Sequence, residues 1–469
     1  MSDGEIRYLG SLKEFNTVTF LETKLNTLVE DELGLPRPLL VSLVIPTKID
    51  ATRETRDSEL RAMKLAMMEC SKLVDLGYLD EIIIIDGSLD EKDGADFNVL
   101  ERVVETAYDS LDLFNRQVKL INENKAQALM AKRGFFDFIV KTVHQSDPNI
   151  FQALKFGLTK EFSRIPMGKG AALWLSIPLT GGDVVCFTDS DIMNFRSENV
   201  MALCHPIIRS WHDPASNTKM VKASYKRLTL SFEPLGSRYF LGGRVTRLFA
   251  IPMLRVLSKE YPEIFGGLNS LRYPLSGEFA MQRNLLEKMS FPNDYSIEIA
   301  LLRQAAKLAD LTQIAQVELH FFSHIGQSTS GLEKMVAQIK EYIIKSLEEG
   351  GMKIQESVWK RILVEYEKEV EKLLIEYESV LTELRKSVAQ ELNVELSHSK
   401  KEDIELFQCF LQILEKPFKR ALRDQQSGLP SWTELNRGAN CFMVNTLLRR
   451  RGNQSTFTRL KDTGLFYGI

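Results

Sequence analysis

The sequence predicts an α/β fold: a mostly parallel β-sheet with flanking helices. Two nearly continuous apolar segments, 39–46 and 81–86, each fit a buried strand. The intervening segment, 55–77, has apolar residues at helical intervals of three and four: Leu60, Met63, Met67, Cys70 and Val74. Strands without polar alternation, joined through a helix, indicate a parallel sheet that is covered on both faces.

A third strand is expected at 183–188, preceded by a helix at 169–177. Each of the three strands is followed by a short polar loop, at 46–48, 86–88 and 189–191. Functional loops of such sheets lie at the carboxyl ends of the strands. We therefore expect these three loops to meet at one edge.

Four regions follow from the distribution of these patterns. They are an N-terminal helical segment (1–38), an α/β half (39–218) with a helical insertion (114–166), a second mixed half (219–345) and a helical C-terminal extension with a tail (346–469). In the second half, strands are expected at 219–224 and 315–323, and helices at 246–257 and 295–309.

The extension carries a long apolar stripe among Glu and Lys residues: Ile354, Val358, Ile362, Tyr366, Val370, Leu373, Tyr377, Leu381, Leu384 and Val388. Its length favours a partner helix, and hence a homodimer, over a helix that lies on its own domain. The basic end, 437–469, is expected to be a solvated tail, with a phosphate in a neighbouring subunit as the alternative.

Composition limits the partners and the compartment. The 469 residues carry a net charge of −3, which does not favour nucleic acid as a partner. No apolar run is long enough to cross a bilayer. The start of the chain is polar, and five scattered cysteines without metal-ligand spacing fit reduced thiols, so we expect a cytoplasmic location.

The strongest chemical signal is the acidic pair that ends the third strand. Asp189 and Asp191 flank Ser190 directly after the apolar residues 184–187. Two carboxylates in this place suit Mg²⁺ or Mn²⁺, which are commonly shared with substrate phosphates. A strand-end turn rich in Asp and Ser is the alternative.

Other segments contribute groups of matching chemistry. Lys169, between two glycines at a helix start, suits an anion. Pro46, Thr47 and Asp50 follow the first strand and could read a base and a ribose, although an ordinary loop fits equally. His324, at a later strand end, is either a third metal ligand or a hydrogen-bonded histidine.

A second group fits an anionic acceptor. Gly243, Arg244 and Thr246 place a guanidinium and free amides at a helix start, where a phosphate or carboxylate would bind. Arg227 adds positive charge nearby in the sequence. Two carboxylates, Glu278 and Glu298, lie among apolar residues, either for chemistry or for structural hydrogen bonds.

Together these segments resemble the glucosyl-3-phosphoglycerate synthases and their mannosyl relatives, which are retaining nucleotide-sugar glycosyltransferases with the GT-A fold. The resemblance extends from about residue 41 to residue 344. It rests on Val-Ile-Pro at 44–46, Ile-Asp-Gly-Ser-Leu-Asp at 85–90, Gly-Lys-Gly-Ala-Ala-Leu-Trp at 168–174, Phe-Thr-Asp-Ser-Asp at 187–191, Gly-Gly-Arg-Val-Thr at 242–246, Pro-Leu-Ser-Gly-Glu-Phe-Ala at 274–280, Tyr-Ser-Ile-Glu-Ile at 295–299 and Ala-Gln-Val-Glu-Leu at 315–319 with His324.

The resemblance implies a role for each candidate residue. Residues of the first half would bind the nucleotide sugar, UDP-glucose or GDP-mannose: Pro46, Thr47, Asp50, Ser88, Lys169, Asp189 and Ser190. The metal would be held by Asp191 and His324, with Asp189 toward the ribose or the metal. Arg227, Gly243, Arg244 and Thr246 would hold the acceptor, and Glu298, with Asp191, would act at the reacting sugar.

The implied reaction moves glucose or mannose to 3-phosphoglycerate, glycerate or a similar small hydroxy acid. The family usually carries an acidic residue sooner after this proline, whereas here the first one after Pro46 is Asp50. This difference leaves the preference for the nucleotide base open. A sugar-1-phosphate nucleotidyltransferase is an alternative, but it would need a glycine-rich loop in place of Pro46-Thr47-Lys48. A non-catalytic nucleotide-binding scaffold is a second alternative, against which the intact Asp189, Asp191, Lys169 and His324 stand.

Overall fold

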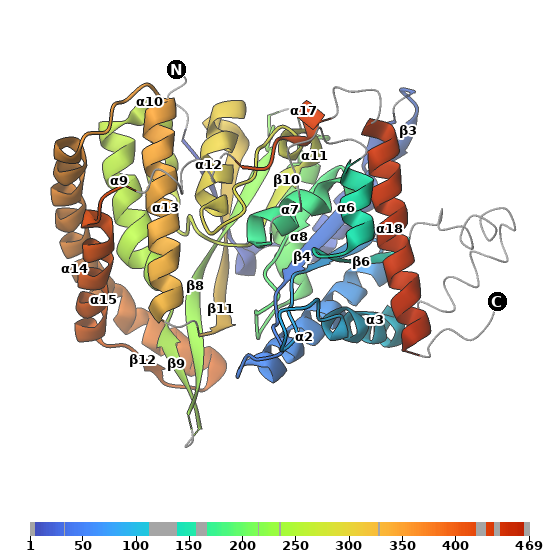
Figure 1. The fold of residues 1–469 in the computed structure, drawn as a ribbon, viewed down its shortest axis with the longest axis horizontal. Helices are drawn as coiled ribbons and strands as arrows, with labels where there is room; N and C mark the ends of the chain where they lie inside the picture. Colours follow the sequence, from blue (N-terminus) through green and yellow to red (C-terminus); the bar gives the residue numbers. More distant parts are fainter. Residues whose placement is uncertain are drawn as a thin grey trace, which may run out of the picture. The chain divides into compact units, whose positions relative to one another are not determined.

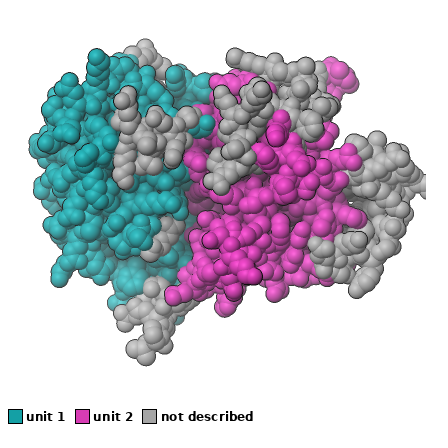
Figure 2. Space-filling model, in the orientation of Figure 1, with its two compact units in different colours: residues 1–11, 222–276, 294–428 teal, residues 12–221, 277–293, 429–469 magenta. Residues whose placement is uncertain are grey.

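The computed structural model describes residues 5–31, 33–111, 138–155, 167–213, 215–233, 236–326, 329–418, 428–435 and 441–463. The chain divides into two compact units, each made of three segments (Figure 2). Unit 1 comprises residues 1–11, 222–276 and 294–428, and unit 2 comprises residues 12–221, 277–293 and 429–469.

Unit 2 contains a sheet with the strand order β10-β7-β4-β5-β6. Figure 1 labels β10, β4 and β6 of this sheet. The strands are β4 (Val41–Thr47), β5 (Glu81–Asp86), β6 (Val140–His144), β7 (Val184–Phe187) and β10 (Phe279–Gln282). The four neighbours β7, β4, β5 and β6 are parallel, and β10 is antiparallel to β7. All residues of β5 and β7 are buried, as strands covered on both faces require. The predicted α/β class with a mostly parallel sheet is confirmed.

The helices of unit 2 cover this sheet. They are α1 (Thr17–Leu25), α2 (Arg56–Asp75), α3 (Asn98–Leu111), α6 (Pro148–Lys155), α7 (Lys169–Ser176), α8 (Ser197–Arg209), α11 (Arg283–Leu286), α17 (Trp432–Leu435) and α18 (Cys441–Asp462). Helix α7 packs on β4 and β5, and α8 packs on β7 and β10. The ring of Trp174 on α7 stacks on Trp432 at 4.6 Å between centroids. The expected helices at 55–77 and 169–177 are therefore present.

The first 38 residues are only partly helical. Besides α1 they contain the strand β1 (Arg7–Ser11) and a hairpin of β2 (Leu28–Glu30) and β3 (Pro36–Pro38). Pro36 and Pro38 cannot donate backbone hydrogen bonds in a helix interior, which is the physical reason for the extended conformation there.

The insertion at 114–166 is not wholly helical either. Val140–His144 forms β6, the edge strand beside β5, within the segment that we expected to be helical. Alternating β-branched residues in Ile139-Val140-Lys141-Thr142-Val143 favour the strand. Helix α6 agrees with the expected helical character of this insertion. Residues 112–137 and 156–166 lie outside the described residues.

The expected solvated tail is instead a docked helix. Helix α18 packs on β6, α3 and α6. Asn453 Oδ1 accepts the Phe138 backbone N–H at 2.9 Å, and Thr456 Oγ1 accepts that of Thr142 at 2.9 Å. The buried α18 residues Val444, Leu448, Gly452, Thr456 and Leu460 recur every four positions, which is the helical spacing of a packed face.

Unit 1 contains the strand order β1-β11-β8, with β9 antiparallel to β8 and β12 parallel to β9. These strands are β8 (Met220–Glu233, in this unit from Lys222), β9 (Gly236–Leu241), β11 (Ile314–Ile325) and β12 (Leu396–Ser397). The helical part comprises the π-helical turn η3 (Thr246–Ala250), α9 (Ile251–Glu260), α10 (Pro262–Phe265), α12 (Ile297–Leu308), α13 (Thr329–Glu349), α14 (Glu356–Leu392) and α15 (Lys400–Glu415).

The long apolar stripe of the extension is covered within its own unit. Helix α14 packs on α9 and α15, as Figure 1 shows, and its stripe residues from Ile362 to Val388 are mostly buried. This corrects the inference that the stripe faces a partner helix. The stripe was too long for one neighbouring helix, but it is shared among α9, α15 and the sheet residues Leu228, Leu241 and Phe321.

Within the described residues, no helix combines the length and the apolar character needed to span a membrane.

Candidate functional site

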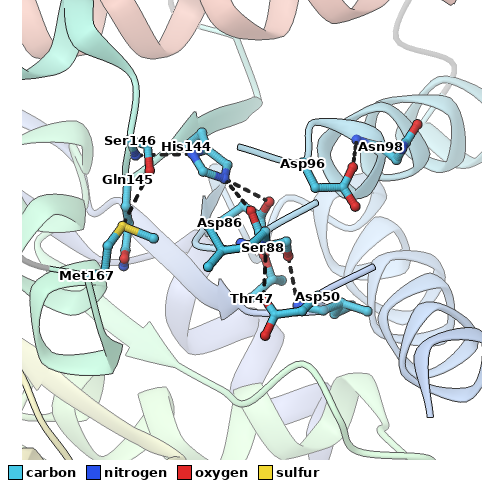
Figure 3. Close-up of polar contacts among 12 residues, drawn as sticks. Thr47, Asp50, Asp86, Ser88, Asp96, Asn98, His144, Gln145, Ser146 and Met167 are labelled. Carbon is cyan, nitrogen blue, oxygen red and sulfur yellow. Dashed lines mark hydrogen bonds and ion pairs between the residues drawn. The ribbon is translucent and has the colours of Figure 1, made fainter. Parts of the chain in front are cut away.

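Three parallel strands of unit 2 end in polar residues at the same level. In the register of the sheet, Thr47 at the end of β4 pairs with Asp86 of β5, and Asp86 pairs with His144 of β6. Figure 3 shows the three side chains gathered at this edge. The sheet therefore places a hydroxyl, a carboxyl and an imidazole side by side, where ligands of α/β sheets bind.

The Asp86 carboxylate is the centre of this cluster. Its Oδ1 accepts hydrogen bonds from Thr47 Oγ1 at 2.7 Å and from Ser88 Oγ at 2.6 Å. The side chain is fully buried. Burial raises its pKa to about 6, against the opposing effect of the hydrogen bonds from Ser88 and Thr47 and of the nearby His144. Through its hydrogen bonds with Thr47 and Ser88, the Asp86 carboxyl group ties the ends of β4 and β5 together.

The surroundings of His144 fix its tautomer. Nδ1 accepts the Ser146 backbone N–H at 3.1 Å, so the ring hydrogen is on Nε2. Nε2 lies 2.9 Å from the Ser88 carbonyl oxygen, to which it donates, and 3.8 Å from Asp86 Oδ2. The imidazole thus holds the loop after β5 from the side of β6.

Two reciprocal bonds join the loops after β4 and β5. Ser88 Oγ accepts the Ile49 backbone N–H at 2.7 Å, and Asp50 Oδ1 accepts that of Leu89 at 2.9 Å. The predicted nucleotide-binding residues Thr47, Asp50 and Ser88 are therefore brought together, as Figure 3 shows. Their side chains bond to the protein itself, which fixes the backbone that a base and a ribose would meet.

The start of α7 lies against neighbouring backbone. Gly168 has φ +145°, and a Cβ there would lie 2.2 Å from the Asn293 carbonyl oxygen. A Cβ on Gly170 would lie 1.6 Å from that of Pro292, so both positions require glycine. Gln145 brackets Gly168: its Nε2 donates to the Gly168 carbonyl at 3.0 Å, and its Oε1 accepts the Gly168 N–H at 3.2 Å.

The lysine and the acidic pair meet at the end of β7. Lys169 Nζ lies 2.7 Å from Asp189 Oδ1, and both side chains are about one-fifth exposed, at 23% and 20%. The Asp189 backbone N–H donates to Glu278 Oε1 at 3.3 Å. A Cβ on Gly277 would lie 2.4 Å from the Asp189 carboxylate oxygens, so only glycine leaves room for this carboxylate. Lys169 and Asp189 thus form one ion pair at the sheet edge.

Asp191 lies beside a second acidic group. Burial raises the pKa of Glu59 on α2, Arg53 opposes this shift, and the negative charge of Asp191 adds a smaller upward contribution. Asp191 itself is partly exposed. Asp191 follows β7, whereas Glu59 lies in the first turn of α2 and is paired with Arg53 at 2.7 Å.

The donor set of unit 2 fits a hard divalent cation. Mg²⁺ is commonly held by one or two carboxylates together with substrate phosphates and water, and Asp191 and Asp189 supply carboxylates here. In the part of the chain that the structure describes, no group of three or more His, Cys, Asp or Glu side chains is arranged to hold a metal ion. Asp189 also carries the ion pair with Lys169.

The remaining predicted residues belong to unit 1. The acceptor loop, which we define as residues 242–246, follows β9, and the Gly242 N–H donates to the Arg227 carbonyl at 2.7 Å. Gly243 has φ +66°, and a Cβ there would lie 2.7 Å from the Tyr273 hydroxyl. Arg244 is half-buried; burial, and then Arg247, lower its pKa. Thr246 is buried. The loop therefore carries a partly desolvated guanidinium.

Two further predicted residues come from other elements of unit 1. Glu298 lies in the first turn of α12 and is 7% exposed. His324 lies near the end of β11, fully buried, with its ring 5.9 Å from that of Tyr225. The predicted set is thus divided: Pro46, Thr47, Asp50, Ser88, Lys169, Asp189, Ser190 and Asp191 are in unit 2, and Arg227, Gly243, Arg244, Thr246, Glu298 and His324 are in unit 1.

Sequence reasoning missed His144 and Gln145. Both lie at or after the end of β6, within a segment that we expected to be helical. A strand followed by His-Gln-Ser-Asp repeats the pattern of an apolar strand with a polar end, which is the signal that identified the other loops. Asp86 was assigned to a loop, but its central place depends on burial and register.

Comparison with known proteins supports the resemblance found in the sequence. The chain is 33% identical over 220 residues to the glucosyl-3-phosphoglycerate synthase of Petrotoga mobilis, a match that covers 46% of this chain and 62% of the relative. It is 36% identical over 173 residues to that of Mycobacterium tuberculosis, covering 37% and 50%. The chain thus matches between half and about three-fifths of the length of these relatives. No protein-family model matches it.

Solved structures of similar proteins carry the same name. The Mycobacterium tuberculosis synthase in complex with phosphoglyceric acid is 24% identical, covers 75% of this chain and 89% of its own, and gives a TM-score of 0.48. Its complex with Mn²⁺, UDP and glucosyl-3-phosphoglycerate is also 24% identical, covers 73% and 86%, and gives a TM-score of 0.47.

Proposed function

We propose that this chain is a metal-dependent retaining glucosyltransferase of the GT-A fold, which moves glucose from UDP-glucose to 3-phosphoglycerate. The carrying observation is the edge of unit 2, where the Lys169–Asp189 pair and Asp191 lie at the end of β7, in the same parallel sheet as the Thr47–Asp86–Ser88 cluster. Support also comes from the similarity to glucosyl-3-phosphoglycerate synthases, which carry that activity in their name.

The nucleotide would be bound by the interlocked loops after β4 and β5. Thr47, Asp50 and Ser88 fix the backbone of these loops, so the groups that meet base and ribose are preorganised. The diphosphate would lie at the start of α7, where the helix dipole and the Lys169 ammonium favour an anion.

Lys169 supplies the charge that stabilises the departing diphosphate. Cleavage of the anomeric C–O bond leaves negative charge on the UDP, and a positioned ammonium lowers the energy of that state. Asp189 holds the ammonium at the sheet edge before the donor binds. Asp191 and Asp189 of unit 2 would hold Mg²⁺ or Mn²⁺, which when bound neutralises phosphate charge. The assignment of His324 as a third ligand stays a prediction.

The acceptor would be bound by the loop of unit 1. Arg244 can form two parallel hydrogen bonds with a phosphate or carboxylate, and Gly243 and Thr246 offer backbone N–H groups beside it. Arg227, whose carbonyl anchors Gly242, adds charge at the same loop. Glu298 is assigned to the acceptor hydroxyl and the sugar. A homodimer, a cytoplasmic location and the lack of a nucleic-acid partner stay predictions.

The test is a turnover assay of the purified chain with UDP-glucose, 3-phosphoglycerate and Mg²⁺ or Mn²⁺. We expect UDP release that requires both the acceptor and the metal, and a product whose anomeric configuration by NMR equals that of the donor. Parallel assays use GDP-mannose and glycerate. Preference for either would correct the donor or the acceptor but keep the reaction class. Pyrophosphate release from UTP and glucose 1-phosphate, without glucosyl transfer, would contradict the proposal.

A further inference from the structure

The C-terminal extension contacts the acceptor loop through one buried ion pair. Arg247, in η3 directly after the loop, donates through both terminal nitrogens to Asp403 in the first turn of α15, at 2.7 and 3.0 Å. Both side chains are buried, at 4% and 6% exposure. A buried guanidinium requires such a partner, because an uncompensated charge in this environment is strongly unfavourable.

The same guanidinium also holds the acceptor loop. Arg247 Nε donates to the Gly242 carbonyl oxygen at 3.0 Å. This carbonyl belongs to the peptide that precedes Gly243, the residue with φ +66°. The peptide is therefore fixed where the chain turns into Arg244. Since Asp403 sets the plane of the guanidinium through two bonds, it also sets the direction of the third bond.

Further contacts join the extension to the same part of unit 1. Strand β12 pairs with β9, the strand that leads into the loop, with Ser397 opposite Phe240. Figure 1 shows β12 beside β9. The Tyr366 hydroxyl on α14 donates to the Leu248 carbonyl of η3 at 2.7 Å, and the Arg247 guanidinium lies 5.2 Å from the centre of the Tyr377 ring. His398 Nε2 lies 3.5 Å from Asp403 Oδ2. The loop is thus braced by residues of α14, β12 and α15.

We propose that Asp403 and Arg247 are positioning residues for acceptor binding, so that the C-terminal extension sets the affinity of the site for its anionic acceptor. The acceptor part of this inference rests on the proposed function. Neither side chain is assigned a contact with a substrate. Their effect passes through the Gly242 carbonyl to the backbone that presents Gly243 and Arg244.

The first test compares Asp403→Asn with a control, Lys400→Gln. Lys400 also links α15 to α14, through an exposed ion pair with Glu378 at 2.6 Å, but it has no bond to the loop. For Asp403→Asn we expect the acceptor KM to rise about ten- to hundredfold, since small misplacements of binding groups have effects of that order, while the donor KM changes less than about twofold. Lys400→Gln should leave both constants unchanged.

A double variant separates positioning from stability. Arg247→Met with Asp403→Leu replaces the pair by apolar side chains, a change that buried ion pairs often tolerate without loss of stability. It still removes the bond to the Gly242 carbonyl. We expect a folded protein with a raised acceptor KM. If the folded double variant has the wild-type acceptor KM, the pair serves stability only and the inference is wrong.

Amide hydrogen exchange of residues 242–247 gives a readout that needs no turnover. Exchange in Asp403→Asn and in the double variant should be faster than in the wild type and in Lys400→Gln. If the wild type transfers no glucose but the exchange changes as expected, the proposed function is wrong and the positioning role stands. Unchanged exchange together with an unchanged acceptor KM overturns the inference.

If both variants fail to fold by circular dichroism, Arg247→Lys takes their place. One ammonium group cannot reproduce all three hydrogen bonds of the guanidinium. Wild-type exchange and a wild-type acceptor KM in Arg247→Lys would equally overturn the inference.

Discussion

The carboxyl ends of β4, β5 and β6 in unit 2, which we call the nucleotide edge after their proposed role, and the proposed acceptor loop of unit 1 are fixed by different kinds of contact. At the nucleotide edge, the polar residues that hold the loops lie on adjacent strands or within a few residues of the strand ends, as in the bonds of Thr47, Ser88 and His144 around Asp86. The acceptor loop depends on Asp403, 156 residues after Arg247. The first site is built from the core of the sheet, and the second needs the helical extension.

This difference determines which substitutions should affect which substrate. Changes at the strand ends of unit 2 should act on the nucleotide, the metal and the rate. Changes in the acceptor loop or the extension should act on the acceptor. The predictions below test this separation, beginning with the largest expected effect.

Asp191→Ala should have the largest effect on turnover. It removes a carboxylate whose proposed role is to hold the divalent cation, and such an ion contributes several kcal/mol of charge stabilisation in the transition state. We expect kcat to fall by at least about a thousandfold. The thermal unfolding midpoint without ligands should be close to wild type, because Asp191 is partly exposed at a strand end. Normal turnover would remove the basis for the metal site.

Asp86→Asn should change how the stability of the protein depends on pH. Asp86 has a pKa of about 6 when folded, above its unfolded value of 3.8. Between these values the folded state binds more protons than the unfolded state, so the free energy of unfolding of the wild type falls as pH rises from about 4 to about 6. The loss is complete above the folded pKa and amounts to up to about 3 kcal/mol.

The asparagine variant lacks this titration. Urea unfolding of both proteins from pH 4 to pH 7 should show the stability of Asp86→Asn relative to wild type increasing with pH. All other ionisable groups are present in both proteins, so the difference between the two curves reports on the substituted carboxyl group. A difference that stays constant over this range would show that the buried carboxyl does not titrate there. Asp86→Asn and the wild type should have the same acceptor KM.

Arg244→Ala should have a smaller effect, confined to the acceptor. Hydrogen bonds to charged groups contribute about 1.5–3 kcal/mol, which corresponds to a rise of about 10- to 150-fold in the acceptor KM. The donor KM should change little. Steady-state kinetics with each substrate varied in turn provides the measurement, and Lys226→Ala, an exposed lysine of β8, is a suitable control. An equal rise in the acceptor KM and the donor KM would contradict the proposal that the two substrates are bound by separate groups.

Sequence alone was sufficient where the signal is local. The strands 41–47, 81–86 and 184–187 were identified because continuous apolar residues can only be buried, and the polar loops that follow them had to meet at the carboxyl edge of a parallel sheet. The glycines on either side of Lys169 were also informative, because neighbouring backbone atoms leave no room for a side chain at these two positions. The meeting of the loops after β4 and β5 could therefore be predicted, and their binding of a nucleotide stays a prediction.

Tertiary structure alone decided the features that depend on distant partners. The strand at 140–144 was hidden because a short edge strand gives a weak periodic signal, and it brings His144 to Asp86. The destination of α18, the covering of the α14 stripe and the pairing of Arg247 with Asp403 follow from how long-range surfaces fit together. Periodicity shows that one face of a helix must be buried, and a charge that becomes buried must be neutralised. Packing across the whole chain selects the segment that covers the face and the residue that neutralises the charge.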